Sequence, residues 1–253
     1  MVAASSKGLG FGIARELAKN GATVCIASRT KNEIENAAEI LRKETGATIH
    51  ASVFDASSAE SITKWIIEVE TAFERIDGLV VNAGGPPPGN FDDFTDEDWQ
   101  EAFNLTLMSA VRLIRGILPA MRVGGGGSIL TVTSMSVKEP VNRLLLSNVL
   151  RSGVTSLVKS LSNELATQNI RVNNLMPGRI DTDRVRSLDK NNAEKSGLSV
   201  EEIKSKNEIT IPLGRYGNID EFGKAGAFLL SPAASYITGI SLAVDGGIMK
   251  TVW

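Results

Sequence analysis

The sequence contains very few of the side chains that build disulfides and metal sites. Its 253 residues include one cysteine, Cys25, and one histidine, His50. A single cysteine excludes a disulfide within these residues, and a histidine without a companion His or Cys argues against a metal site. We therefore expect Cys25 to be a small buried thiol, His50 to be a strand residue, and no residue to bind metal.

Long apolar runs and a strong net charge are also missing. There is no stretch of about 18 apolar residues and no signal-peptide pattern, so we expect no membrane span and a cytoplasmic protein. Lys and Arg number 27 against 29 Asp and Glu, which gives a net charge of −2. The basic residues are dispersed rather than clustered, and this argues against a nucleic-acid partner.

Short apolar runs alternate with amphipathic stretches along the whole chain. Residues 22–27, 78–81 and 170–175 have strand length, and the segments between such runs repeat apolar residues at helical spacing. Buried apolar strands separated by helices predict a parallel sheet covered on both faces. We predict the α/β class, with a three-layer Rossmann fold, a doubly wound parallel sheet of about seven strands, and helices on both faces. Residues 1–253 form one domain in this prediction, because no linker or repeat divides them.

The first strand is unusually short for the centre of such a sheet. Only residues 1–4 represent it before the chain turns. A central strand of four residues leaves backbone groups of its neighbours unpaired, which is costly. We therefore expect about five to ten natural residues upstream of Met1, from the usual strand length.

The least regular region is residues 179–211, which is polar and rich in charge. We predict one helix in it, capped by Ser199 with Glu202, and a mobile substrate lid over the sheet edge where ligands bind. The same Ser-x-x-Glu spacing predicts that Ser57, with Glu60, caps the helix after the third strand.

A glycine-rich turn joins the first strand to the first helix. The segment from Ser5 to Gly10 would present backbone N–H groups and a helix N-terminus to phosphate. The second strand ends in Ser28 and Arg29, without the acid that usually holds ribose hydroxyls. Arg29 suits a 2′-phosphate instead, and Lys7 adds a second positive charge. These residues predict NADP(H) in preference to NAD(H).

Together with motifs farther along, this pattern resembles the short-chain dehydrogenase/reductase family over essentially the whole chain. The family's Thr-Gly-x-x-x-Gly-x-Gly corresponds to residues 3–10, with alanine for the threonine and the first glycine. Its Asn-Asn-Ala-Gly corresponds to residues 81–84, with valine first, and its Pro-Gly after the sixth strand to residues 177–178. Residues 214–247 fit its C-terminal third. The nearest members in general pattern are 3-oxoacyl-(acyl-carrier-protein) reductases and archaeal and bacterial sugar dehydrogenases.

The resemblance implies a single NAD(P)-binding domain whose cofactor residues lie at the carboxyl ends of the strands. They are Ala4, Ser6, Lys7, Gly8, Leu9, Gly10, Ser28, Arg29, Asp55, Ala56, Asn82, Ala83, Gly84, Arg151, Pro177, Gly178, Ile180 and Thr182. Asp55 is expected to touch adenine, and Ile180 and Thr182 the nicotinamide amide. The family further implies a homotetramer, built from the helices that carry Val111 and Leu157 and from the last strand.

The catalytic residues of the family are Asn, Ser, Tyr and Lys. Asn104 and Ser134 fall on the first two, whereas the Tyr position holds Ser147 and the Lys position holds Arg151. In the family the Lys lowers the Tyr pKa from about 10, so that the phenol protonates the substrate oxygen. Ser147 does not titrate usefully but can donate a hydrogen bond, and Arg151 keeps its proton.

Three interpretations of this Ser-x-x-x-Arg segment stay open. Ser134, Ser147 and Arg151 polarise a carbonyl and the proton passes through water, or Lys138 or Glu139 acts as a substitute acid. Either gives an NADP(H)-dependent oxidoreductase acting on CH–OH groups, which reduces a carbonyl or oxidises a secondary alcohol of a small 3-oxoacyl-thioester or sugar-like substrate. The third is a catalytically weak or inactive NADP(H)-binding or sensing module. We favour the enzyme, because the other family motifs are retained.

The lid is expected to select the substrate. Its mixture of leucines and charged residues fits neither an acyl chain nor a sugar decisively. An acyl-carrier-protein substrate would need a basic patch near the pocket, for which Arg184, Arg186 and Lys190 are candidates.

Overall fold

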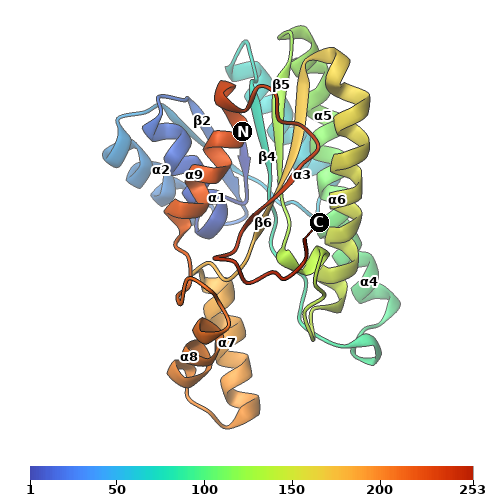
Figure 1. Cartoon of the computed structure of the whole chain (residues 1–253). Helices are drawn as coiled ribbons and strands as arrows, with labels where there is room; N and C mark the ends of the chain where they lie inside the picture. Colours follow the sequence, from blue (N-terminus) through green and yellow to red (C-terminus); the bar gives the residue numbers. More distant parts are fainter. Residues whose placement is uncertain (253) are drawn as a thin grey trace.

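In residues 1–252, the part of the chain that the computed structural model describes, seven strands form one parallel sheet (Figure 1). The strand order is β3-β2-β1-β4-β5-β6-β7. The strands are β1 (Val2–Ala3), β2 (Val24–Ser28), β3 (Ile49–Val53), β4 (Gly78–Val81), β5 (Gly127–Val132), β6 (Ile170–Pro177) and β7 (Ser241–Val244). This topology confirms the predicted doubly wound sheet.

Within the same residues, nine α-helices connect the strands. They are α1 (Gly8–Lys19), α2 (Lys31–Thr45), α3 (Ala59–Ala72), α4 (Asp96–Phe103), α5 (Ser109–Val123), α6 (Leu145–Leu165), α7 (Asp183–Ser196), α8 (Val200–Ile209) and α9 (Ile219–Leu230). The π-helical turn η2 (Asn104–Met108) joins α4 to α5, and short 3-10 turns are η1 (Phe91–Asp93), η3 (Met135–Val137), η4 (Ala166–Gln168) and η5 (Pro232–Ala234). None of the described helices has the length and apolar character needed to cross a membrane.

Two apolar cores cover the two faces of the sheet. Helices α3, α5 and α6 pack on one face, where Trp65, Leu113 and Val154 are buried. Helices α1, α2 and α9 pack on the other, with Ile34 and Phe222 buried (Figure 1). Each such side chain contributes about 1.5–3 kcal/mol on burial, so the continuous apolar runs that predicted the strands also hold the three layers together.

The strand order reverses at β1, and this reversal positions the candidate site. Val2 pairs with Ile26 of β2 on one side and with Val80 of β4 on the other. In doubly wound folds, the connections after two such adjacent strands go to opposite faces of the sheet. This leaves a crevice at the carboxyl edge, and ligands bind there.

The lid contains two helices, α7 and α8, where the sequence predicted one. Helix α7 buries only Asp189 and Ala193, so it has no apolar stripe from which periodicity could reveal it. The predicted cap of α8 is confirmed, because Ser199 and Glu202 form a capping box. The cap predicted at Ser57 is wrong by one residue: Ser58 caps α3.

Candidate active site

A strained turn links β1 to the glycine-rich segment. Ala4 has a left-handed φ of 48°, and its carbonyl accepts a hydrogen bond of 3.0 Å from the Asn82 side-chain amide. A Cβ on Gly10 would lie 2.6 Å from that carbonyl, so only glycine fits there. The Ser5 hydroxyl, which the sequence prediction omitted, donates to Val2 and accepts from the Ala27 amide. The turn is thereby fixed to both β1 and β2.

The start of α1 follows directly. Gly8 has a φ of 62°, and Lys7 at the N-cap gives no side-chain hydrogen bond to the helix. Lys7, the second positive charge predicted for the phosphate, has two carboxylates nearby. Its exposed ammonium lies 3.5 Å from Glu33 and 3.6 Å from Asp183.

The end of β2 places two predicted residues side by side. The Ser28 hydroxyl is buried and has no hydrogen-bond partner in residues 1–252. Arg29 is exposed, and no carboxylate of the described chain pairs with it. A buried hydroxyl without a partner costs about 1–3 kcal/mol, which a ligand atom at this position would offset.

Two further predicted groups lie at the same edge of the sheet. Asp55 accepts hydrogen bonds from both the amide and the hydroxyl of Ser57 through its Oδ1 atom, and the adjoining Ala56 is buried. A Cβ on Gly8 would lie 3.6 Å from the Thr182 methyl group. The first residues of the lid are therefore close to the glycine turn.

The segment after β6 is held close to the body of the protein. A Cβ on Gly178 would lie 2.6 Å from the Cα of Asp245, so the backbone passes close beside the end of β7. Ile180 is buried and forms a bridge with Gly217. These contacts fix the place where the lid begins.

Ser147 and Arg151 contact each other across one turn of α6. The Arg151 Nε donates to the Ser147 Oγ at 3.1 Å, and Nη1 donates to the carbonyls of Val132 at 3.0 Å and Thr133 at 3.3 Å. The two N–H groups on Nη2 have no acceptor in residues 1–252. Ser147 is only 8% exposed, and its own O–H has no acceptor in the described chain. Both side chains thus keep donors free for a ligand.

Burial, followed by the charge of Arg184, lowers the pKa of the Arg151 guanidinium from 12.5 to about 10. Arg151 therefore stays protonated at neutral pH. It also lines a small cavity with Asn82 and Thr106, whose hydroxyl is buried and has no partner in residues 1–252.

The remaining predicted catalytic residues lie around this pair. Ser134 follows the Thr133 carbonyl that Arg151 binds, and its hydroxyl caps η3 by accepting from the Ser136 amide at 3.1 Å. Asn104 begins the π-helical turn and accepts from Arg112 at 3.4 Å. Arg151 therefore contacts Ser147 directly and is linked to Ser134 through the Thr133 carbonyl, whereas Asn104 is not among the residues that line the cavity.

Asn174 is a positioning residue that the sequence prediction missed. It is fully buried, and its Oδ1 accepts hydrogen bonds of 2.9 Å from both Thr131 and Thr133. It therefore fixes the end of β5 immediately before Ser134. A buried asparagine in an apolar strand was the available signal, because a buried amide needs partners.

Glu139, one of the two substitute acids considered, is engaged elsewhere. Its Oε1 accepts from the backbone amides of Lys250 at 2.6 Å and Thr251 at 3.0 Å. These bonds direct the carboxylate to the C-terminal segment. For Lys138, the neighbouring candidate, the described chain provides no ion pair and no side-chain hydrogen bond.

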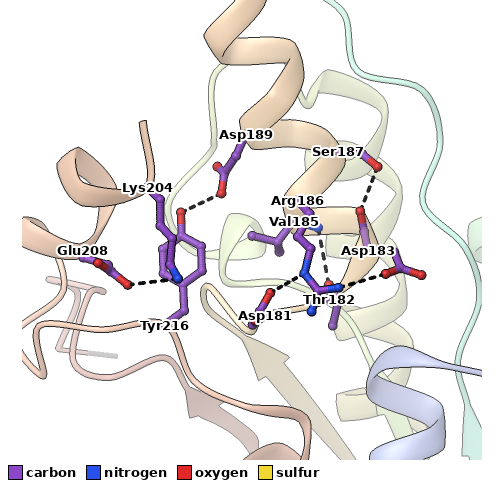
Figure 2. Close-up of polar contacts among 10 residues, drawn as sticks. All are labelled: Asp181, Thr182, Asp183, Val185, Arg186, Ser187, Asp189, Lys204, Glu208 and Tyr216. Carbon is purple, nitrogen blue, oxygen red and sulfur yellow. Dashed lines mark hydrogen bonds and ion pairs between the residues drawn. The ribbon is translucent and has the colours of Figure 1, made fainter. Parts of the chain in front are cut away.

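Both tyrosines lie outside the Ser147–Arg151 pair. Tyr236 is fully exposed, whereas Tyr216 is buried beneath the lid and donates to Asp189 at 2.8 Å (Figure 2). Burial, followed by the hydrogen bond to Asp189, raises the pKa of Tyr216 to about 12. That phenol is a poor acid at neutral pH and connects the two lid helices, because Asn207 of α8 contacts both Tyr216 and Asp189.

Two of the three basic residues considered for a patch near the pocket, Arg184 and Arg186, have partners within the protein. Arg186 pairs with Asp181 and Asp183, so its charge is neutralised within the lid (Figure 2). Arg184 donates to the Pro86 carbonyl at 2.8 Å and thereby ties α7 to the loop after β4.

The donor set fits a phosphorylated dinucleotide. The glycine turn, the helix start without a side-chain cap and the unpartnered Ser28 hydroxyl are groups that such a ligand would satisfy. Within residues 1–252, no cluster of three His, Cys, Asp or Glu side chains could hold a metal ion.

Comparison with known proteins gives a consistent match over the whole chain. A family profile described as Enoyl-(Acyl carrier protein) reductase matches residues 3–249. Dehydrogenase/reductase SDR family member 4 of Sus scrofa is 34% identical over 248 residues, covering 98% of this chain and 85% of that protein.

Two solved structures have the same overall fold. L-sorbose reductase from Gluconobacter frateurii, complexed with NADPH and L-sorbose, has a TM-score of 0.94 and 30% identity, over 99% of this chain and 96% of that one. An NADPH-bound short-chain oxidoreductase from Pseudomonas aeruginosa PAO1, described as containing an atypical catalytic center, has a TM-score of 0.89 and 29% identity over the same shares of the two chains.

Proposed function

Because this chain belongs to the short-chain dehydrogenase/reductase family of oxidoreductases, we propose that it is an NADP(H)-dependent enzyme that interconverts a carbonyl and a secondary alcohol. The observation that carries the proposal is the Ser147–Arg151 contact. It gathers a buried hydroxyl and a guanidinium with free donors next to Ser134, at the carboxyl edge of the sheet.

NADP(H), when bound, would supply the hydride. The glycine turn and the start of α1 would hold its pyrophosphate, and Arg29 with Ser28 would hold the 2′-phosphate. Support comes from the exposed Arg29 without a carboxylate partner and from the NADPH-bound relatives. Asp55, Asn82 and the segment from Pro177 to Thr182 would contact the rest of the dinucleotide.

Ser147 takes the position of the family's tyrosine in this proposal, and Arg151 that of its lysine. The Ser147 and Ser134 hydroxyls donate hydrogen bonds to the substrate oxygen. Arg151 donates to the Ser147 oxygen and thereby strengthens that hydroxyl as a donor, because linked hydrogen bonds polarise one another. The positive charge beside them stabilises negative charge as it develops on the substrate oxygen.

The proton comes from water in this scheme. Neither tyrosine lies in the pair, Tyr216 has a pKa of about 12, and Glu139 binds the C-terminal backbone. A serine hydroxyl held by a guanidinium keeps its own proton, so it orients the substrate oxygen while water delivers the proton.

The substrate class we propose is a 3-oxoacyl-thioester or a sugar-like carbonyl compound. The family profile is described by an acyl-carrier-protein reductase, and the Gluconobacter frateurii relative binds L-sorbose. The two-helix lid over the site selects between such substrates.

The test is oxidation of NADPH and of NADH by wild-type protein over a panel of ketones, 3-oxoacyl thioesters and ketoses. We expect turnover with NADPH and a large loss in Ser134→Ala. Ser160→Ala, which changes an exposed hydroxyl farther along α6, serves as the matched control and should behave as wild type. Equal turnover in wild type and Ser134→Ala would contradict the proposal.

We also propose self-association, as a homotetramer in the cytoplasm, through the outer faces of α5 and α6 and through the last strand, β7. Val149 of α6 is 48% exposed and would contribute apolar area to such an interface. Light scattering coupled to size-exclusion chromatography measures the assembly directly.

A further inference from the structure

A second cavity lies between the start of α6 and the lid. It lies between the loop after β4, the loop before α6 and the lid. Its lining residues are Pro88, Val141, Asn142, Arg143, Leu144, Arg179, Leu188, Asn191, Asn192 and Lys195. Leu144 is the N-cap of α6, whose first turn carries Ser147, so the cavity lies at the end of the helix that holds the proposed reaction centre.

The charges around this cavity have one sign. Arg143, Arg179 and Lys195 line it, and no acidic residue does. Arg179 pairs with Asp189, but within residues 1–252 no carboxylate pairs with Arg143 or Lys195. Both side chains are on exposed residues, so their ammonium and guanidinium groups can reach a ligand.

Several carboxylates of the lid have partners within it. Asp181 and Asp183 bind Arg186, and Glu208 pairs with Lys204 (Figure 2). Asp189 accepts from Tyr216 and pairs with Arg179, so Arg143 and Lys195 are the two cavity cations without a carboxylate partner in residues 1–252. In a chain with a net charge of −2, this distribution is not a consequence of overall composition.

Apolar side chains share the lining of this cavity with the cations. They are Pro88, Val141, Leu144 and Leu188. A fitting ligand has a short apolar segment next to the carbonyl and an anionic group beyond it.

We propose that the substrate is a carbonyl compound with a terminal anion, a carboxylate or a phosphate, which Arg143 and Lys195 bind at the end of a short apolar segment. This inference rests on the proposed function, because it assumes that the carbonyl binds at Ser147. Charge-assisted hydrogen bonds from two cations recognise either anion.

The test compares oxo acids with their methyl esters, which have the same carbon chain but no charge. 4-Oxopentanoate, 5-oxohexanoate and 6-oxoheptanoate, each beside its ester, are titrated calorimetrically into protein saturated with NADP⁺, which cannot reduce them. We expect at least one acid to bind about tenfold more tightly than its ester, the scale of one charge-assisted hydrogen bond, and its affinity to fall with added salt.

One double variant removes both cations, and a matched single variant keeps them. Arg143 has a φ of 62°, so Arg143→Asn is the suitable change, because asparagine tolerates the left-handed region. Arg143→Asn with Lys195→Gln should bring the acid-to-ester ratio close to one. Lys206→Gln, an exposed lysine of α8 outside the cavity lining, should keep the wild-type ratio.

Acids that bind no better than their esters, no measurable acid binding, or an unchanged ratio in the double variant would each overturn the inference. 5-Oxohexyl phosphate, added to the series, assigns the anion: tighter binding than 5-oxohexanoate indicates a phosphate substrate, and weaker binding a carboxylate. Turnover with NADPH is measured separately. Selective acid binding without turnover would contradict the proposed function and leave the anion site standing.

Discussion

Arg151 donates a hydrogen bond of 3.1 Å to the Ser147 hydroxyl while its Nη1 binds the carbonyl of Thr133, the residue before Ser134. One side chain thus connects the two serines of the proposed reaction centre. A charged donor on a serine oxygen leaves the O–H of that serine free, and this arrangement is the basis of the predictions that follow.

Replacing Arg151 should weaken cofactor binding. Arg151→Met removes the charge, three donated hydrogen bonds and the two unpartnered N–H groups that we assign to the ligand. We expect the Kd for NADPH, measured by fluorescence titration, to rise about 10–100-fold, the effect of losing a charged hydrogen-bond donor. Arg151→Lys should restore part of the lost affinity for NADPH. Arg115→Met, at an exposed arginine of α5, is the control, and an equal effect there would contradict the assignment.

Arg29 should determine the preference for the 2′-phosphate. In Arg29→Ser we expect the Kd for NADPH to rise about 10–100-fold and that for NADH to stay the same, since only NADPH carries the phosphate. Lys43→Ser, at an exposed lysine at the far end of α2, tests for a general charge effect. If the affinities for NADPH and NADH fell equally in Arg29→Ser, the proposed contact between Arg29 and the 2′-phosphate would be contradicted.

The pH dependence of turnover should differ from that of an enzyme with a tyrosine acid. Neither Ser134 nor Ser147 titrates near neutrality, so we expect a flat rate between about pH 6 and pH 9. Burial lowers the pKa of Arg151 to about 10, and its charged form, which is the active one, exists below that pH. The rate should therefore fall as the pH rises through about 10. A turnover rate that instead changed with a pKa near neutral pH would indicate a different catalytic acid.

Tyr216 should contribute to stability rather than to catalysis. Tyr216→Phe removes the hydroxyl that donates to Asp189, a carboxylate that is 3% exposed. Leaving a buried carboxylate short of a partner should lower the free energy of unfolding by about 1–3 kcal/mol in urea denaturation. Tyr236→Phe, at a fully exposed site, should leave it unchanged. Loss of turnover without loss of stability in Tyr216→Phe would return this phenol to the list of candidate acids.

Local signals in the sequence predicted the elements of the sheet well. The strand Gly78–Val81 has the predicted bounds, because its buried apolar run ends at the Asn82 turn. Helix α7 was missed, since its two buried residues give no periodic pattern.

Contacts between distant parts of the chain could not be predicted in this way. Lys7 pairs with Asp183, and Glu139 binds Lys250, across separations that no local pattern encodes. The predicted residues of the reaction centre gather because strand ends meet at one edge of a parallel sheet. The partners that set the charge of each one depend on packing of the lid and the C-terminal segment.

The central claim is that Ser147, held by Arg151, serves this enzyme in place of a tyrosine acid. The most direct measurement is NADPH-dependent reduction of the best carbonyl substrate by wild type, by Ser147→Ala and by the Ser147→Tyr, Arg151→Lys double variant. We predict turnover by wild type and a loss of about 10²–10³-fold in Ser147→Ala, the range found when one oxyanion donor is removed. A silent wild type beside an active double variant would contradict the claim, because it would show an intact pocket that lacks only the acid.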